Sequence, residues 1–188
     1  PASPEAQALD ASLRRDLGNP DTTALVVITA PDTQAALHKA EQAAAVLQQL
    51  GQAGVIAGFE TPTRFLPSDA TQRSRQQALP ARDVLQQRLQ QAVQGLPVEA
   101  ERLQPFVQDV EQARTGPLLQ RPSLQGTAMA LAVDAMLQPH AGGVAALLPV
   151  RGLQDVDGNP QSVNGAAVRQ ALLASGLAQP GGSDVLFI

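Results

Sequence analysis

Two apolar runs with a helical pattern between them open the chain, and they constrain its fold more than any other feature. Residues 24–30, Ala-Leu-Val-Val-Ile-Thr-Ala, have the composition of a buried β-strand. A helix is predicted between Asp32, a suitable N-cap, and Gly51, with four apolar residues on one face: Leu37, Ala40, Ala44 and Leu47. The second apolar run, residues 54–59, follows after a short connection. This order predicts a strand–helix–strand unit.

The C-terminal third contains a second unit of the same kind. Residues 132–138 and 144–150 are compatible with strands, and the Gly-Gly pair between them predicts a hairpin whose glycines supply positive φ. Asn164 is expected to cap a helix that ends at Gly176. Residues 184–188 then form the last strand.

The middle of the chain is helical in pattern and rich in glutamine. Pro62 and Pro67 interrupt regular structure after the second strand. Helices are then predicted from Ser68 to about Ala78, over residues 81–94, and from Pro105 onward. A loop over residues 116–124 follows. We interpret this block as an insertion between two halves of a sheet.

The first residues predict one more helix. Leu9, Leu13 and Leu17 recur every four residues, which favours a short helix over residues 5–17. Gly18 and the residues after it are expected to end that helix. Its leucine stripe is expected to pack on the body of the protein.

Together these elements predict an α+β fold most similar to a ferredoxin-like split βαβ sheet, with a helical insertion and an extra hairpin strand. A single domain is expected, with a first βαβ half over residues 1–60, a helical insertion over residues 61–125, and the hairpin and second βαβ half over residues 126–188. One difficulty is that the strand at 144–150 would be central and already flanked on both sides. Its hairpin partner at 132–138 must therefore displace a strand or lie beyond the ideal four.

Composition argues against several classes of function. Aromatic residues are only 2% of the chain and its formal net charge is −4, so neither a base-stacking platform nor a cationic phosphate-binding surface is expected. We therefore predict no nucleic-acid partner. The chain has no cysteine, which excludes disulfides and thiolate chemistry but leaves both the cytosol and the periplasm open.

No set of residues has the pattern of a catalytic, metal or cofactor site. The two histidines, His38 and His140, lack a second ligand at metal spacing and are interpreted as a solvated helix residue and a turn residue. The segment from Asp155 to Asn159 resembles a calcium loop only faintly, because its glycine is misplaced, and an Asp/Asn/Gly turn explains it better. No serine lies in a Gly-x-Ser-x-Gly elbow. We predict no catalytic residue, no metal and no cofactor.

The most distinctive polar stretch contains Arg64, Phe65, Arg73 and Arg75. Arginine and aromatic residues are enriched at interfaces, so these four residues are a candidate surface for a partner or a substrate. The alternative is a helix with a solvated basic face and Phe65 tucked into the core.

Four phrases in order resemble one known family. They are Leu-Arg-Arg-Asp-Leu-Gly at 13–18, Arg-Phe-Leu-Pro-Ser-Asp-Ala-Thr-Gln-Arg-Ser-Arg-Gln-Gln-Ala-Leu-Pro at 64–80, Leu-Gln-Pro-Phe-Val-Gln-Asp-Val-Glu-Gln-Ala-Arg at 103–114, and Leu-Pro-Val-Arg-Gly-Leu at 148–153. The set resembles an extracytoplasmic loop domain of MMPL-type predicted exporters, within the resistance-nodulation-division (RND) superfamily. The resemblance covers nearly all of this chain but only a minority of such an exporter.

The resemblance implies a non-catalytic, porter-like domain on the periplasmic side of the bacterial inner membrane. Its partners would be the remainder of the exporter, meaning the transmembrane helices and a second periplasmic domain, and a lipid-like substrate. Transport of lipids or acyl-type products would be driven by protons, through residues outside this chain. A homo-oligomer in the intact pump is left open.

Two expectations follow from this resemblance. The stretch from Thr61 to Pro67 is a candidate hinge, and contact with acyl chains would require a contiguous apolar groove. The main rival hypothesis is a stand-alone soluble ferredoxin-like module that binds a ligand or a partner. A small hydrolase or transferase is the third and weakest hypothesis.

Overall fold

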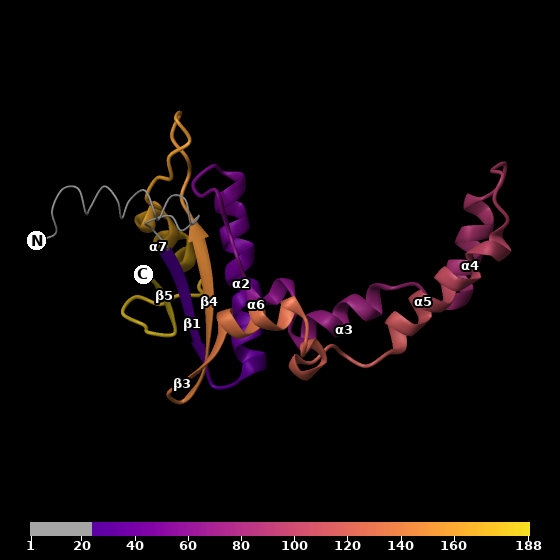
Figure 1. Cartoon of the computed structure of the whole chain (residues 1–188), viewed down its shortest axis with the longest axis horizontal. Coiled ribbons are helices and arrows are strands. Elements are labelled where there is room, and N and C mark those ends of the chain that lie inside the picture. Colours follow the sequence, from indigo (N-terminus) through magenta and orange to yellow (C-terminus); the bar gives the residue numbers. More distant parts are fainter. Residues whose placement is uncertain (1–23) are drawn as a thin grey trace, which may run out of the picture.

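The computed structural model describes residues 24–188, and the helix predicted over residues 5–17 lies outside this described part. Figure 1 shows a sheet backed by helices, from which further helices lead away. The strands are β1 Ala24–Ala30, β2 Gly58–Phe59, β3 Leu137–His140, β4 Gly143–Arg151 and β5 Val185–Phe187. The α-helices are α2 Thr33–Gln52, α3 Asp69–Ala78, α4 Arg82–Ala92, α5 Gln104–Thr115, α6 Ala128–Met136 and α7 Gly165–Ala174. Short 3-10 helices are η1 Pro62–Arg64, η2 Ala100–Leu103 and η3 Arg121–Leu124.

The fold is α+β, with a five-stranded antiparallel sheet in the order β2-β4-β1-β5 and β3 paired to β4. Strand β1 pairs with β4 along its whole length, from Ala24 opposite Val150 to Ala30 opposite Val144. On its other side β1 pairs with β5. Strands β1 and β2 therefore run parallel to each other with β4 between them, and β4 and β5 run parallel with β1 between them. The apolar runs near the two ends of the chain share one sheet.

The hairpin strand β3 and the short strand β2 both pair with the same edge of β4. Strand β2 pairs with Val150 and Arg151 at the C-terminal end of β4, whereas β3 pairs with residues 143–146 at its N-terminal end. Because β2 is only two residues long, the same edge has room for both strands. The hairpin turn uses Gly142 at φ 85°, and a side chain on Gly143 would meet the Ala30 carbonyl oxygen.

Two predicted strands are shorter than expected. The prediction of a strand over 54–59 was wrong for its first part: Gly54 adopts φ 69° in a turn and Ile56 is buried in the core, so pairing begins only at Gly58. The prediction of a strand over 132–138 was wrong for most of its length, because residues 128–136 form α6. The Thr127 side chain caps this helix by accepting from the Ala130 N–H, which starts the helix before the apolar run.

Most helix boundaries agree with the predictions. The side chains of Asp32, Ser68 and Asn164 cap α2, α3 and α7 by accepting a backbone N–H three residues later. Helix α2 continues through Gly51 instead of ending before it. Pro105 lies in the first turn of α5, as expected.

The core lies between one face of the sheet and the helices α2 and α7. Val26 and Ile28 of β1 are fully buried there, as is Leu148 of β4. Facing them are α2 residues that are also fully buried, three of them alanines: Ala36, Leu37, Ala40, Ala43 and Leu47. Small side chains allow α2 to approach the sheet closely, which suits a chain with so few aromatic residues.

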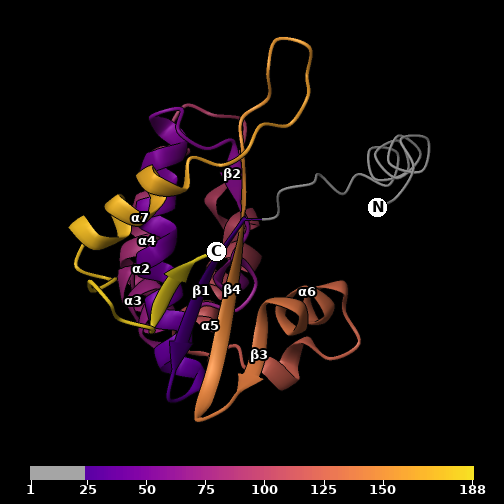
Figure 2. The same cartoon turned by 90° about the vertical axis from the view of Figure 1, so that its left-hand side faces the viewer.

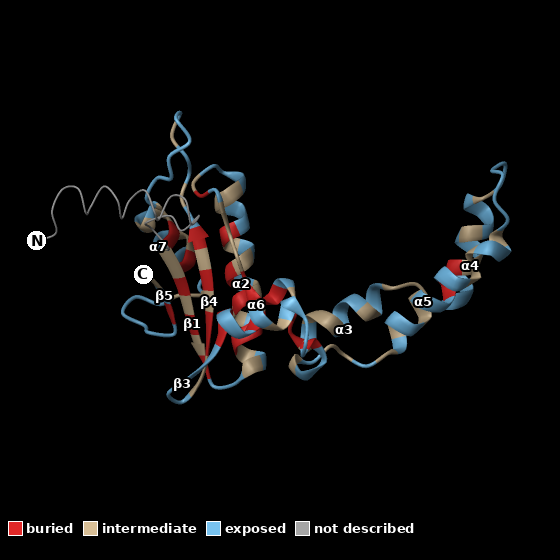
Figure 3. Cartoon of the chain, in the orientation of Figure 1, coloured by how far each residue is buried: buried red, intermediate tan, exposed pale blue. Residues whose placement is uncertain are grey.

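Helices α3, α4 and α5, with η2, form an arm that leads away from the sheet (Figure 1). Figure 3 shows that most of this arm is exposed, in contrast to the sheet. Helix α3 buries no residue, α4 buries Leu85 and α5 buries Val107. Neither of these two residues belongs to the main core cluster. The arm therefore has a small core of its own.

Candidate functional site

The arm is attached to the body where the start of α3, residues 68–76, meets α2 and the returning chain over residues 113–120. We call this region the root of the arm, and it is rich in hydrogen bonds from polar side chains. At its centre lies Glu41 of α2, whose carboxylate accepts from the Ser68 N–H at 2.8 Å, the Ser68 hydroxyl at 2.8 Å and the Thr71 hydroxyl at 2.7 Å. Ser68 is itself almost fully buried. A carboxylate at the N-terminus of a helix also interacts favourably with the helix dipole. Glu41 thus fixes where α3 begins.

A second contact joins the same two helices. Gln34 donates to the Asp69 carboxylate at 3.0 Å and accepts from the Asp69 N–H at 2.8 Å. Gln120 also donates to this carboxylate, at 3.2 Å. The first turn of α3 is therefore held by side chains from both α2 and the returning chain.

The glutamines of α3 hold the segment that returns from the tip of the arm. Gln72 donates to the Leu119 carbonyl at 3.0 Å and accepts from the Leu119 N–H at 2.7 Å. One turn later, Gln76 donates to the carbonyls of Ala113 and Gly116, at 3.1 and 2.9 Å. An amide side chain can satisfy a backbone donor and acceptor at once, as a strand would. These contacts explain how a helix without a buried residue stays attached.

Arg64 and Phe65 of the predicted surface belong to the body of the protein. Arg64 ends η1 and forms an ion pair of 2.9 Å with Glu60. Phe65 is half-buried and packs against the main core. The sequence-based alternative, in which Phe65 lies in the core, agrees with this position.

Arg73 and Arg75 lie apart from that pair on helix α3, where both are exposed. Neither forms an ion pair with a residue of the described part of the chain. Their side chains remain available to a partner on the arm. No contact among the described residues brings the four predicted residues together as one site.

The candidate hinge from Thr61 to Pro67 is packed into the body. Thr61 and Thr63 are buried, and their hydroxyls share a hydrogen bond of 2.8 Å. Leu66 is also buried and belongs to the main core. These contacts argue against a hinge at this stretch.

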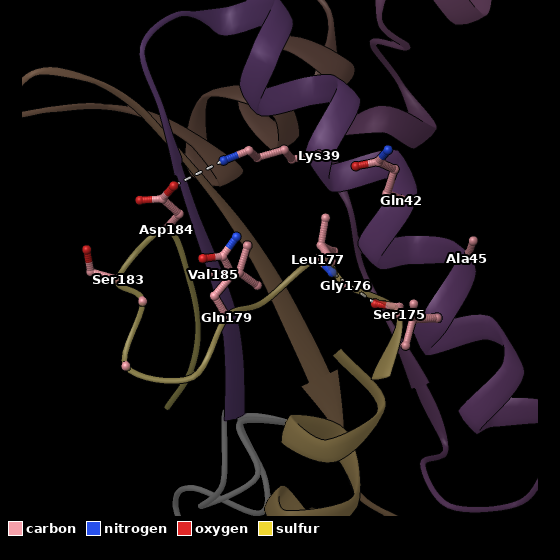
Figure 4. Close-up of a pocket in the computed structure, with 13 residues that line it drawn as sticks. Lys39, Gln42, Ala45, Ser175, Gly176, Leu177, Gln179, Ser183, Asp184 and Val185 are labelled. Atoms are coloured by element: carbon pink, nitrogen blue, oxygen red, sulfur yellow. Dashed lines mark hydrogen bonds and ion pairs between the residues drawn. The ribbon is translucent and has the colours of Figure 1, made fainter. Parts of the chain in front are cut away.

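A hollow of about 800 Å³ lies between α2 and the chain after α7. Lys39 and Gln42 line it from α2, and residues 175–185 line the other side (Figure 4). Lys39 reaches across and forms an ion pair of 3.4 Å with Asp184. The lining mixes charged, amide and backbone groups with a few apolar side chains, so this hollow is not the apolar groove expected for acyl chains.

A neighbouring hollow of about 620 Å³ shares Lys39, Ser183 and Asp184 with the first. It is also lined by Val27 and Leu186 of the sheet. The ion pair between Lys39 and Asp184 therefore stands between two open spaces. Such an arrangement can bind a small polar or anionic group only if that group competes with Asp184 for the ammonium of Lys39.

Neither the histidines nor the aspartate-rich loop belongs to a cluster of potential metal ligands in the described part of the chain. Within residues 24–188 no group of three or more potential ligands could hold a metal ion. Asp155 accepts from the backbone N–H groups of Asp157 and Asn159 at 2.9 and 2.8 Å, which makes the predicted Asp/Asn/Gly turn. The Asn159 side chain also donates to it, and these hydrogen bonds lower the pKa of the Asp155 carboxyl.

No helix of the described part is long and apolar enough to cross a membrane. The chain matches no protein-family model, and no curated protein is significantly similar to it.

Several residues that make the central contacts of the structure were not predicted from the sequence. The sequence pattern did not single out Glu41 or Lys39, and Gln72 and Gln76 occurred only within the phrase at 64–80. One feature of the sequence could have indicated the role of the glutamines. Residues 69–78 contain no apolar stripe, so a helix there must be attached to the protein by polar side chains. Two glutamines four residues apart lie on one face of such a helix.

Proposed function

We propose that the sheet is a ferredoxin-like split βαβ unit of the porter-domain type, with the arm as a helical insertion and β3 as an extra strand. The order β2-β4-β1-β5 supports this, because each β–α–β unit places its two strands on either side of a strand from the other unit. Helices α2 and α7 are the two connections, and both pack on the same face of the sheet.

We infer that this unit is a non-catalytic periplasmic domain of an MMPL-type exporter in the inner membrane. The single observation that carries the inference is that the phrases resembling this family occupy positions that shape the fold. Residues 64–80 build the root of the arm, residues 103–114 form most of α5, and residues 148–153 include the centre of the sheet. Of the three phrases within the described residues, each contributes buried residues to the structure: Leu66 and Ser68 from the first, Val107 from the second, and Leu148 and Val150 from the third. These buried positions support the resemblance.

The proposal assigns the described residues no chemical step. Its partners are the transmembrane helices and second periplasmic domain of the same pump, with a lipid or acyl-type product as substrate and protons as the driving force. A homo-oligomer of the pump is compatible with it. The arm, with Arg73 and Arg75 exposed on α3, is the part best placed to contact such partners.

The first test is the sequence of the intact gene product. The proposal requires an apolar segment of about 20 residues on each side of this region in the reading frame, long enough to cross a bilayer. A reading frame without either segment would exclude an exporter domain between transmembrane helices.

The second test measures transport. In a strain that lacks the gene, the lipid composition of the outer membrane is compared with that of a strain carrying the intact gene and one carrying a version with residues 24–188 replaced by a linker. We expect a lipid-type component to disappear in the deletion strain and to return only with the intact gene. If the linker version restores it as well, this domain has no part in transport.

The second candidate function is a stand-alone ligand-binding module, and the hollow at Lys39 and Asp184 favours it. In that case the isolated chain should bind a small anion, and inorganic phosphate is a suitable probe. NMR shifts centred on residues 181–185, lost in Lys39→Ala and kept in Gln48→Ala, would support this function. Flanking apolar segments in the reading frame would argue against it.

A further inference from the structure

The face of the sheet opposite α2 and α7 is apolar, and no described element covers it. Val27 of β1 lies opposite Leu147 of β4 and Leu186 of β5, so these three side chains share this face. The same alternation adds five further residues in the central part of this face, and we call this central set the open face: Leu25, Val27, Thr29, Ala145, Leu147, Pro149, Leu186 and Ile188. In Figure 2 strands β1, β4 and β5 face the viewer with no described helix in front of them.

The composition of the open face is that of a buried surface. In an antiparallel sheet with one solvated face, the residues of that face are normally polar. Among the eight residues of the open face Thr29 is the only polar one, while Gln138, His140 and Arg151 lie at the margins of the same sheet face, on β3 and at the end of β4. Leu186 and Ile188 are 42% and 66% exposed, while Leu25, Val27 and Leu147 are half-buried. A contiguous apolar surface of this kind indicates a covering partner.

We propose that this partner is the N-terminal segment of the same chain, with Leu9, Leu13 and Leu17 packed on the open face. Their spacing of four residues places them on one side of a helix. In such a helix Arg15 would lie on the opposite side and face water. The proposal concerns the architecture of the domain and does not depend on the transport function.

Geometry supports this occupant. Strand β1 begins at Ala24, which lies opposite Val150 at one end of the sheet. Residues 18–23 can span at most about 20 Å, and a helix over residues 5–17 would be about 20 Å long. Strand β1, with seven residues, is about 24 Å long. The tether is therefore long enough to place the helix along the strands and short enough to keep its local concentration high.

Engineered disulfides test this arrangement cleanly, because the natural chain contains no cysteine. Leu186→Cys is combined in the full chain with Leu9→Cys, Leu13→Cys or Leu17→Cys, and the matched control combines it with Arg15→Cys. Leu186 is partly exposed, so its replacement should leave the fold intact. A second series uses Leu147→Cys at the centre of the face.

We expect an intramolecular disulfide to form on mild oxidation with at least one of the three leucine positions, at least tenfold faster than with Arg15→Cys. The product is detected as a monomer of altered mobility on a non-reducing gel and by a loss of two mass units. Equal rates for Arg15→Cys and the leucine positions would overturn the proposal. Concentration-dependent disulfide-linked dimers would overturn it too, and would assign the open face to a second copy of the chain. Absence of any cross-link in both series would also overturn it.

Discussion

Glu41 is the single residue on which the attachment of the arm depends most. Its carboxylate is the common acceptor of Ser68 and Thr71, and its side chain is only 18% exposed. Hydrogen bonds to a charged acceptor that is largely shielded from water contribute more than those between neutral groups. The start of α3 is therefore coupled to α2 through one side chain.

Replacing Glu41 tests this coupling. We expect Glu41→Ala to lower the free energy of unfolding by about 2–3 kcal/mol, because three donors at the root lose a charged acceptor. Amide hydrogen exchange over residues 68–72 should accelerate. Gln48→Ala, an exposed position on the same helix, is the control and should leave both measurements unchanged. A Glu41→Ala variant with the stability of the natural chain would contradict this role.

Asp155 makes the loop after β4 sensitive to acid. Its hydrogen bonds to Asn159 and Asp157 lower the pKa of this carboxyl in the folded protein. A lowered pKa means that the turn is fully stabilised at pH values above the ordinary aspartate pKa of about 4, and that the stabilisation disappears as pH falls through the lowered value.

We therefore expect the side-chain carboxyl signal of Asp155 to titrate below the ordinary aspartate range in NMR experiments. The backbone amide signals of Asp157 and Asn159 should shift with it, since both N–H groups donate to this carboxylate. In Asp155→Asn these amide shifts should lose their pH dependence. If Asp155→Asn keeps the dependence and Asp157→Asn abolishes it, the assignment to Asp155 is wrong.

At the scale of elements, α3 stays in place through polar contacts alone. It buries no side chain, yet Gln72 pairs with both backbone groups of Leu119 and Gln76 reaches Ala113 and Gly116. Hydrogen bonds of this kind are weaker in net terms than apolar burial. The arm should therefore open locally more readily than the sheet unfolds.

Gln72→Ala tests that difference between elements. It leaves the Leu119 N–H without its acceptor, so we expect a loss of about 1–2 kcal/mol in the local stability of the root. Hydrogen exchange at the Leu119 amide should become roughly tenfold faster or more, while the amides of Val26 and Ile28 keep their protection. Gln77→Ala, exposed on the same helix, serves as the control. Equal acceleration in the arm and the sheet would contradict local opening.

At the scale of the whole molecule, the protein consists of a sheet with its own core and an arm with a separate small one. Leu85 and Val107 are buried in the arm and belong to no part of the main cluster. The hydrogen bonds of Gln76 join α3, where the chain enters the arm, to Ala113 and Gly116, where the chain leaves it. The outer part of the arm should thus be removable without loss of the sheet.

We predict that replacing residues 80–112 with a short Gly-Ser linker leaves the sheet folded. The melting temperature of the body should change by less than about 4 °C, because the removed residues contribute little to the main core. Circular dichroism should show less helix, and the NMR signals of β1, β4 and β5 should persist. An unfolded or aggregated product would mean that the arm and the sheet form one cooperative unit.

Local patterns in the sequence were enough to predict β1, α2, the N-caps at Asp32, Ser68 and Asn164, and the last strand. In each of these, burial and capping act over a few residues and leave a periodic signature. The length of β2 and the helical start of α6 were not predictable in this way. Val133 and Met136 suit a strand or a buried helix equally, and the choice depends on what packs against them.

Local sequence patterns alone were enough to predict an α+β chain whose apolar segments near both ends form strands, with a polar helical stretch between them. Only the tertiary structure decided that β2 and β3 share one edge of β4, and that Glu41 and the glutamines of α3 hold the arm. A hydrogen bond between residues 27 or 47 positions apart in the sequence leaves no periodic trace in the chain. Its partners become visible only when folding brings them within reach.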